Sequence, residues 1–256
     1  MNPPTLRPHE TERLQRLEGH ADALLGRVIA LHIQLGFADP LMPPDAPLLP
    51  PPDHRRFYGG LSALRETLVR GCVLDFVGAV SDEDRRTPSL VSLAKELEKD
   101  EVVTVLRRMV EVDAYRGVGG FQVNDSGFGE SERRQAVERF EEQLDQFRTA
   151  WTDFEARPFA QELKAVRDKV VAHKELRSTP DGYQFVSPSG LNIPWSEFLD
   201  ECLRLGKLCE LVGLIVRRTH FVFSHEVEGL LEAGRHLWMD LGVITDPSQG
   251  ERAPDK

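Results

Sequence analysis

One stretch of the sequence carries an arginine and a histidine that could act on an anionic substrate. Residues 165–175 read AVRDKVVAHKE, and a helix through them places Arg167 inside its own apolar stripe. His173 lies at the edge of that stripe, roughly 120° around and about 9 Å along the axis from Arg167, whereas Asp168 points outward. A guanidinium binds phosphates or carboxylates, and an imidazole moves protons near neutral pH. These residue types at this spacing therefore indicate an anion site.

Alternatively, Arg167 forms a salt bridge with a carboxylate of the same chain. An unpaired charge on an apolar face costs several kcal/mol, so Arg167 requires an anion, a ring of acceptors or a wet cleft. Glu201 and Glu210 of a later helix are candidate internal partners. In that case the chain is a purely structural bundle, and His173 with Lys174 complements the dipole at the end of its helix.

The arginine to histidine spacing is not specific by itself. The residue after Arg167 is an acid, whereas the residues after the competing arginines are neither amides, acids nor imidazoles. Three other pairs have four to six intervening residues: Arg13 with His20, Arg27 with His32, and Arg218 with His225.

The signature of the HEPN superfamily resembles one segment of this chain: Arg167-Asp168, four further residues and His173. As expected for that signature, the segment closes a predicted helix that precedes a polar loop and a long helix. The resemblance implies an all-α fold, a HEPN-like helical bundle with extra N- and C-terminal helices. It also implies a metal-independent endoribonuclease without a cofactor that leaves a 2′,3′-cyclic phosphate. In that chemistry His173 transfers protons, Arg167 stabilises the phosphate and Asp168 orients the arginine or the substrate.

Two further segments, 57–75 and 87–97, look like the abortive-infection U-type branch (AbiU-like) of this superfamily, and the resemblance spans roughly residues 55–220. It implies a toxin or phage-defence component whose partner is RNA. Pairing of two copies around a shared cleft, as in HEPN proteins, implies a homodimer with a composite site. The alternative is a non-catalytic HEPN module that binds a protein partner or a cognate antitoxin through the same face.

Composition limits how such a protein could bind nucleic acid. The net charge is −10 and the pI is about 5.4, which excludes a protein that coats nucleic acid by bulk electrostatics. RNA contacts must be local, and arginine pairs at 107/108, 133/134 and 217/218 could supply them or be solvated faces.

Several other site classes are excluded by what the motifs lack. The three cysteines lie among apolar neighbours without a Cys-x-x-Cys pair, so we expect buried reduced thiols and no zinc or redox centre. His225-Glu226 resembles the start of a zinc-protease motif, but Gly229 occupies the place of the second histidine. The glycine-rich segment 116–129 lacks the Gly-Lys-Ser/Thr of a phosphate cradle, so we expect a surface loop.

The localisation that we expect is cytoplasmic, without membrane contact. The N-terminus lacks the apolar core of a signal peptide. The longest apolar run, 211–216, is too short to span a membrane.

Apolar residues recur at helical spacing along most of the chain and predict an all-α bundle. We expect a proline-rich connector over 40–52, a Thr87-Pro88 helix start, a helix capped by Ser131, and a hairpin pairing 183–186 with 192–193. The expected helices span 10–35, 54–80, 87–99, 101–115, 131–157, 158–176, 194–218 and 224–241.

The predicted organisation has four parts. They are an N-terminal helix with its connector (1–52), a HEPN-like domain (53–220), a C-terminal helix (221–245) and a disordered tail (246–256).

Overall fold

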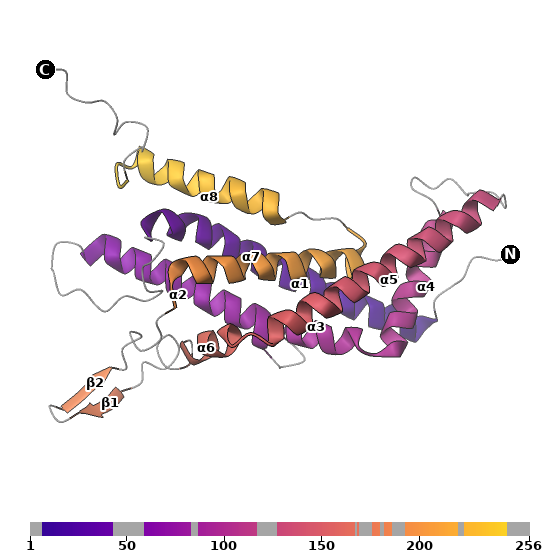
Figure 1. Cartoon of the computed structure of the whole chain (residues 1–256), viewed down its shortest axis with the longest axis horizontal. Coiled ribbons are helices and arrows are strands. Elements are labelled where there is room, and N and C mark those ends of the chain that lie inside the picture. Colours follow the sequence, from indigo (N-terminus) through magenta and orange to yellow (C-terminus); the bar gives the residue numbers. More distant parts are fainter. Residues whose placement is uncertain are drawn as a thin grey trace, which may run out of the picture. The chain divides into compact units, whose positions relative to one another are not determined.

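Eight α-helices, a 3-10 segment, a π-helical segment and one two-stranded hairpin make up the part of the chain that the structure, a computed structural model, describes (Figure 1). The described residues are 7–42, 59–82, 87–116, 127–166, 168, 176–179, 182–185, 193–219 and 223–244. The helices are α1 (Pro8–Ala38), α2 (Gly59–Ser81), α3 (Leu90–Leu97), α4 (Asp100–Arg116), α5 (Gly127–Glu155), α6 (Phe159–Val166), α7 (Trp195–Val212) and α8 (Phe223–Asp240). The all-α prediction is confirmed.

Helical periodicity predicted the buried faces of α1 and α5, but it was wrong for the start of α2, where Leu61 and Leu64 are exposed, and for Leu237 of α8, which is also exposed. The apolar residues that recur at helical spacing along α1 are all buried: Leu14, Leu17, Ala21, Leu24, Val28, Leu31 and Leu35. The aromatic stripe of α5 (Phe140, Phe147, Trp151 and Phe154) is buried as well. Residues spaced three or four apart share one face of a helix, and burial of that face stabilises helices that would be marginal alone. The three cysteines are buried free thiols, as expected.

Three local predictions were wrong. Ser89, not Thr87, caps α3: its hydroxyl accepts a hydrogen bond from the backbone N–H of Ser92, and the Ser92 hydroxyl accepts one from the backbone N–H of Ser89. Ser131 lies inside α5, which begins at Gly127. Strand β2 (Gly182–Phe185) pairs with β1 (Leu176–Thr179) and not with 192–193. Its antiparallel register places Thr179 opposite Gly182. The predicted connector from 43 onward, the core of the glycine-rich segment and the C-terminal tail lie outside the described residues.

The chain divides into two compact units that interleave along the sequence. Unit 1 comprises Met1–Gly26, Ala79–Pro158 and Lys207–Phe221. Unit 2 comprises Arg27–Gly78, Phe159–Gly206 and Val222–Lys256.

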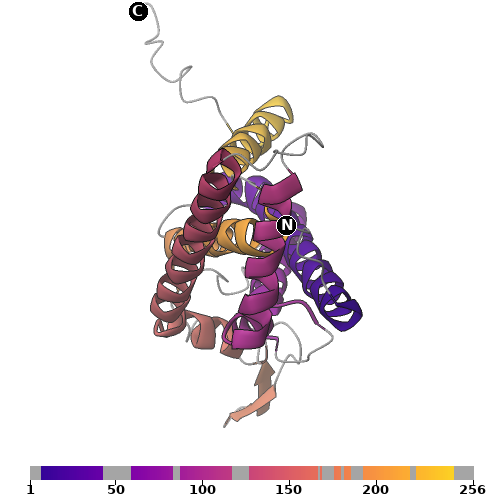
Figure 2. The ribbon, with the colours of Figure 1, turned by 90° about the vertical axis from the view of Figure 1, so that its right-hand side faces the viewer.

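Unit 1 is organised around the pairing of α4 with α5 (Figure 2). Arg107 of α4 forms an ion pair with Glu141 of α5 at 2.5 Å. Arg108 pairs with Glu10 of α1 at 2.7 Å. The end of α7 continues into the π-helical segment η4 (Gly213–Arg217), which packs on α5.

In unit 2, α8 contacts the 3-10 segment that follows α1 and runs beside the C-terminal part of α1 (Figure 1). Gly36 and Gly234 lie at their closest approach, because a Cβ added to Gly234 would be 1.7 Å from the carbonyl oxygen of Gly36. The indole Nε1 of Trp238 donates a 2.8 Å hydrogen bond to the carbonyl of Phe37. Helix α8 is thus one packing partner of the C-terminal part of α1.

The helix formed by α1 and the following 3-10 segment η1 (Asp39–Leu41) is long and apolar enough, by length and composition alone, to cross a membrane. A buried core helix meets the same criterion. The apolar face of α1 from Leu14 to Leu35 is buried within the protein.

Candidate functional site

The helix that leads into the predicted site is held by its aromatic and aliphatic face. Phe159, Leu163 and Val166 of α6 are buried. The ring of Phe159 packs edge-on against Phe76 of α2, with centroids 5.8 Å apart, and stacks on Phe198 of α7 at 6.4 Å. The predicted apolar stripe of this helix is therefore confirmed up to Val166, the residue before Arg167.

The structure describes one of the three predicted site residues. Asp168 has a half-buried side chain and π-helical backbone. Arg167 and His173 lie outside the described residues. A π-helical turn contains more residues than an α-helical turn, so the angle predicted at 100° per residue does not hold for Asp168. Asp168 is correspondingly less exposed than the outward position that the regular helix predicted.

The carboxylates proposed as internal partners for Arg167 lie on α7. Glu201 is buried, with 2% of its side chain exposed, and its Oε1 is 3.4 Å from Nε of Arg204. Glu210 is half-buried.

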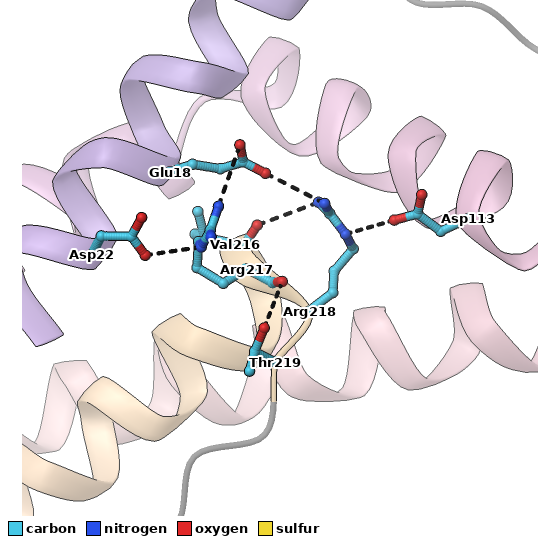
Figure 3. A network of polar contacts seen from close by, with 7 residues as sticks. All are labelled: Glu18, Asp22, Asp113, Val216, Arg217, Arg218 and Thr219. Carbon is cyan, nitrogen blue, oxygen red and sulfur yellow. Dashed lines mark hydrogen bonds and ion pairs between the residues drawn. The ribbon is translucent and has the colours of Figure 1, made fainter. Parts of the chain in front are cut away.

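Four of the arginines considered as RNA contacts are engaged with carboxylates. Besides Arg107 and Arg108, these are Arg217, which ends η4, and Arg218, which follows it (Figure 3). Such ion pairs offset part of the positive charge that a phosphate would meet at these four arginines.

The arginines at the end of η4 share one acidic partner. The carboxylate of Glu18 on α1 forms ion pairs with both: Oε2 is 3.5 Å from Nη1 of Arg217, and Oε1 is 3.3 Å from Nη2 of Arg218 (Figure 3). Nε of Arg217 is 2.9 Å from Asp22, and Nε of Arg218 is 2.6 Å from Asp113. Arg218 adopts a left-handed backbone with φ of 55°, which costs energy for a residue with a side chain.

These arginines border an open cavity of about 620 Å³ in unit 1. Arg139 of α5 also lines it, together with Asp113 and Glu132. The acids around this cavity balance its arginines, so it does not favour an anionic ligand.

A second cavity in unit 1, of about 400 Å³, was not predicted. It is lined by basic side chains of α1 and α3, of which Arg16 and Lys95 are exposed. No group of three or more His, Cys, Asp or Glu residues that could hold a metal occurs within the described ranges.

Comparison with known protein families identifies a match over most of the chain. The sequence model of the HEPN family described as AbiU2 matches residues 54–229. This segment includes Arg167, Asp168 and His173, and it excludes α1 and the C-terminal part of α8. No curated protein and no solved structure matches the chain.

Proposed function

This chain belongs to the AbiU2 branch of the HEPN superfamily, and from that premise we propose that it is a metal-independent endoribonuclease of an abortive-infection system, acting in the cytoplasm. One observation carries the proposal. Arg167-Asp168 and His173 lie within the matched segment and directly follow the buried end of α6. The π-helical backbone at Asp168 supports it, because π-helical turns within helices often occur at functional sites.

The proposed roles follow from the chemistry of the side chains. His173 takes the proton from a ribose 2′-hydroxyl or gives one to the leaving 5′-oxygen, as an imidazole can near neutral pH. Arg167 binds the phosphate and stabilises the negative charge that grows on its non-bridging oxygens. Asp168 orients the arginine or the substrate.

The reaction balances without water, metal or an oxidant. The 2′-oxygen forms a bond to the adjacent phosphorus, and the bond from phosphorus to the 5′-oxygen breaks. The proton lost by the 2′-hydroxyl is matched by the proton gained by the 5′-oxygen. The products are a 2′,3′-cyclic phosphate and a 5′-hydroxyl end.

We further propose that the site is composite, with motifs from two copies of the chain facing one cleft. The HEPN family membership supports this, because pairing of two copies around a shared cleft would let the arginine of one motif and the histidine of the other reach a single phosphate. Light scattering at micromolar concentration should show a dimer. A strict monomer that still cleaves RNA would contradict the composite site.

Cleavage assays of the full chain test the ribonuclease. Labelled single-stranded RNA is incubated in EDTA with the wild type, Arg167→Ala, His173→Ala and Lys164→Ala. Lys164 is an exposed base on α6 and serves as the matched control. We expect cleavage by the wild type and the control alone, and none of an RNA with 2′-deoxy sugars, because the nucleophile is then absent.

Equal inactivity of all four proteins on a broad RNA panel would instead favour a non-catalytic module that binds a partner protein or antitoxin. Thermal melts of Arg167→Ala address the structural alternative. Loss of several kcal/mol would indicate an internal ion pair, since removing one partner leaves a buried carboxylate uncompensated.

A further inference from the structure

The unpredicted cavity of about 400 Å³ lies within unit 1 and is lined by α1, α3 and the start of α4. Four cationic side chains line it: Arg13 and Arg16 of α1, and Lys95 and Lys99 from α3 and the segment after it. This volume falls within the range of about 300–1,000 Å³ that is typical of small-molecule sites.

Two of the four cations are offset by carboxylates. The guanidinium of Arg13 is 2.5 Å from Glu101, and Nζ of Lys99 is 2.5 Å from Glu96. Arg16 and Lys95 form no ion pair with any described residue. The cavity therefore retains an excess of positive charge in a chain whose net charge is −10.

The cavity also offers apolar contacts. Leu17 and Val102 are buried residues of its lining, and Val91 is half-buried.

We propose that this cavity binds a nucleoside phosphate. The phosphate lies against Arg16 and Lys95, the base or sugar covers the apolar lining, and His20 at the same cavity offers a ring for stacking. The concentration of cations in a small hollow suits a compact group with one or two negative charges. An acidic peptide would spread its charges over a much larger surface, since stable protein interfaces bury about 800 Å² on each partner.

This site goes beyond the proposed ribonuclease function. Arg16 lies on α1, which is outside the matched family segment, and none of the lining residues belongs to the Arg167–His173 motif. Binding here can therefore be tested whether or not the chain cleaves RNA.

Calorimetric titration of the full chain with adenosine monophosphate at low salt tests the proposal. The Arg16→Gln/Lys95→Gln pair should weaken binding about tenfold or more, as expected for loss of charge-assisted hydrogen bonds. The matched control is Arg134→Gln/Lys207→Gln, which removes the same charge from exposed positions of α5 and α7 outside the cavity. The control should bind as the wild type does.

A third variant should change affinity in the opposite direction. Glu96→Gln removes a negative charge from the cavity and releases Lys99, so adenosine monophosphate should bind severalfold more tightly. The proposal would be overturned by any of three results. Neither the wild type nor Glu96→Gln gives a binding heat, the cavity and control pairs lose the same affinity, or an acidic peptide binds more tightly than the nucleotide. Thermal melts confirm that each variant is folded.

A second titration distinguishes the sources of the nucleotide. If it belongs to an RNA strand, the cavity pair weakens binding of a short oligoribonucleotide and adenosine monophosphate competes with it. If it is free, the pair loses mononucleotide binding and retains RNA binding. Arg167→Ala and His173→Ala should leave mononucleotide affinity unchanged, which separates this site from the proposed catalytic one.

Discussion

Substitution of Gly234 by alanine should break the docking of α8 on α1. An added Cβ would lie 1.7 Å from the carbonyl oxygen of Gly36 and 2.5 Å from its carbon, whereas such contacts stay beyond about 3 Å. The helices must separate by more than about 1 Å, which also weakens the 2.8 Å hydrogen bond from Trp238 to Phe37. Overpacking costs about 1–3 kcal/mol and a lost hydrogen bond about 0.5–1.5 kcal/mol.

Gly229 provides the control on the same helix. It is exposed, and an added Cβ meets nothing within 4 Å. Gly229→Ala should therefore stabilise α8 by about 0.5–1 kcal/mol through helix propensity. In urea unfolding followed by tryptophan fluorescence, the free energy of unfolding of Gly234→Ala should be about 2–4 kcal/mol lower than that of Gly229→Ala. Equal stability of the two variants would refute the close helix contact.

Three further predictions concern buried and paired groups. Burial lowers the pKa of His32 below its ordinary value of 6.5, against the opposing effect of the Val28 and Cys202 carbonyls. As pH falls below 6.5 the unfolded chain binds the proton first, so stability should decline by up to about 1.4 kcal/mol per pH unit. His32→Gln should reduce that slope in pH-dependent melts, and an unchanged slope would contradict the assignment. Glu18→Gln should destabilise by about 1 kcal/mol in urea unfolding, because Glu18 contacts two arginines, whereas Asp145→Asn at an exposed pair should have no effect. Burial raises the pKa of all three cysteine thiols, so Ellman's reagent should label them only in denaturant; rapid labelling of the native protein would be inconsistent with their burial.

Helical periodicity is sufficient to predict most of the fold. The buried face of α1 and the aromatic stripe of α5 follow from residues three and four apart, because burial repeats with the helical turn. It does not predict backbone register within a helix. The π-helical segment before Arg218 and the π-helical backbone at Asp168 change the hydrogen-bonding pattern without changing the residue types that a helix prefers.

Contacts between distant segments were the part that the sequence could not predict. Arg16 and Lys95 both occupy solvent-facing positions of their helices, and nothing in either local pattern indicates that they line one cavity. The close contact between the backbones of Gly36 and Gly234 likewise could not be predicted, because neither glycine differs from others in its local sequence pattern. In the candidate site, the apolar face of α6 was predictable from spacing, whereas the position of Asp168 depended on a departure from α-helical geometry.

The rate of RNA cleavage by His173→Ala in EDTA tests the central proposal most directly. Removing a general acid or base lowers a rate by about 10²- to 10⁴-fold, so single-turnover cleavage should fall by that factor relative to Lys164→Ala. The wild-type product should carry a 2′,3′-cyclic phosphate end. Wild-type cleavage that disappears in EDTA, or that His173→Ala retains at full rate, would contradict a metal-independent HEPN ribonuclease.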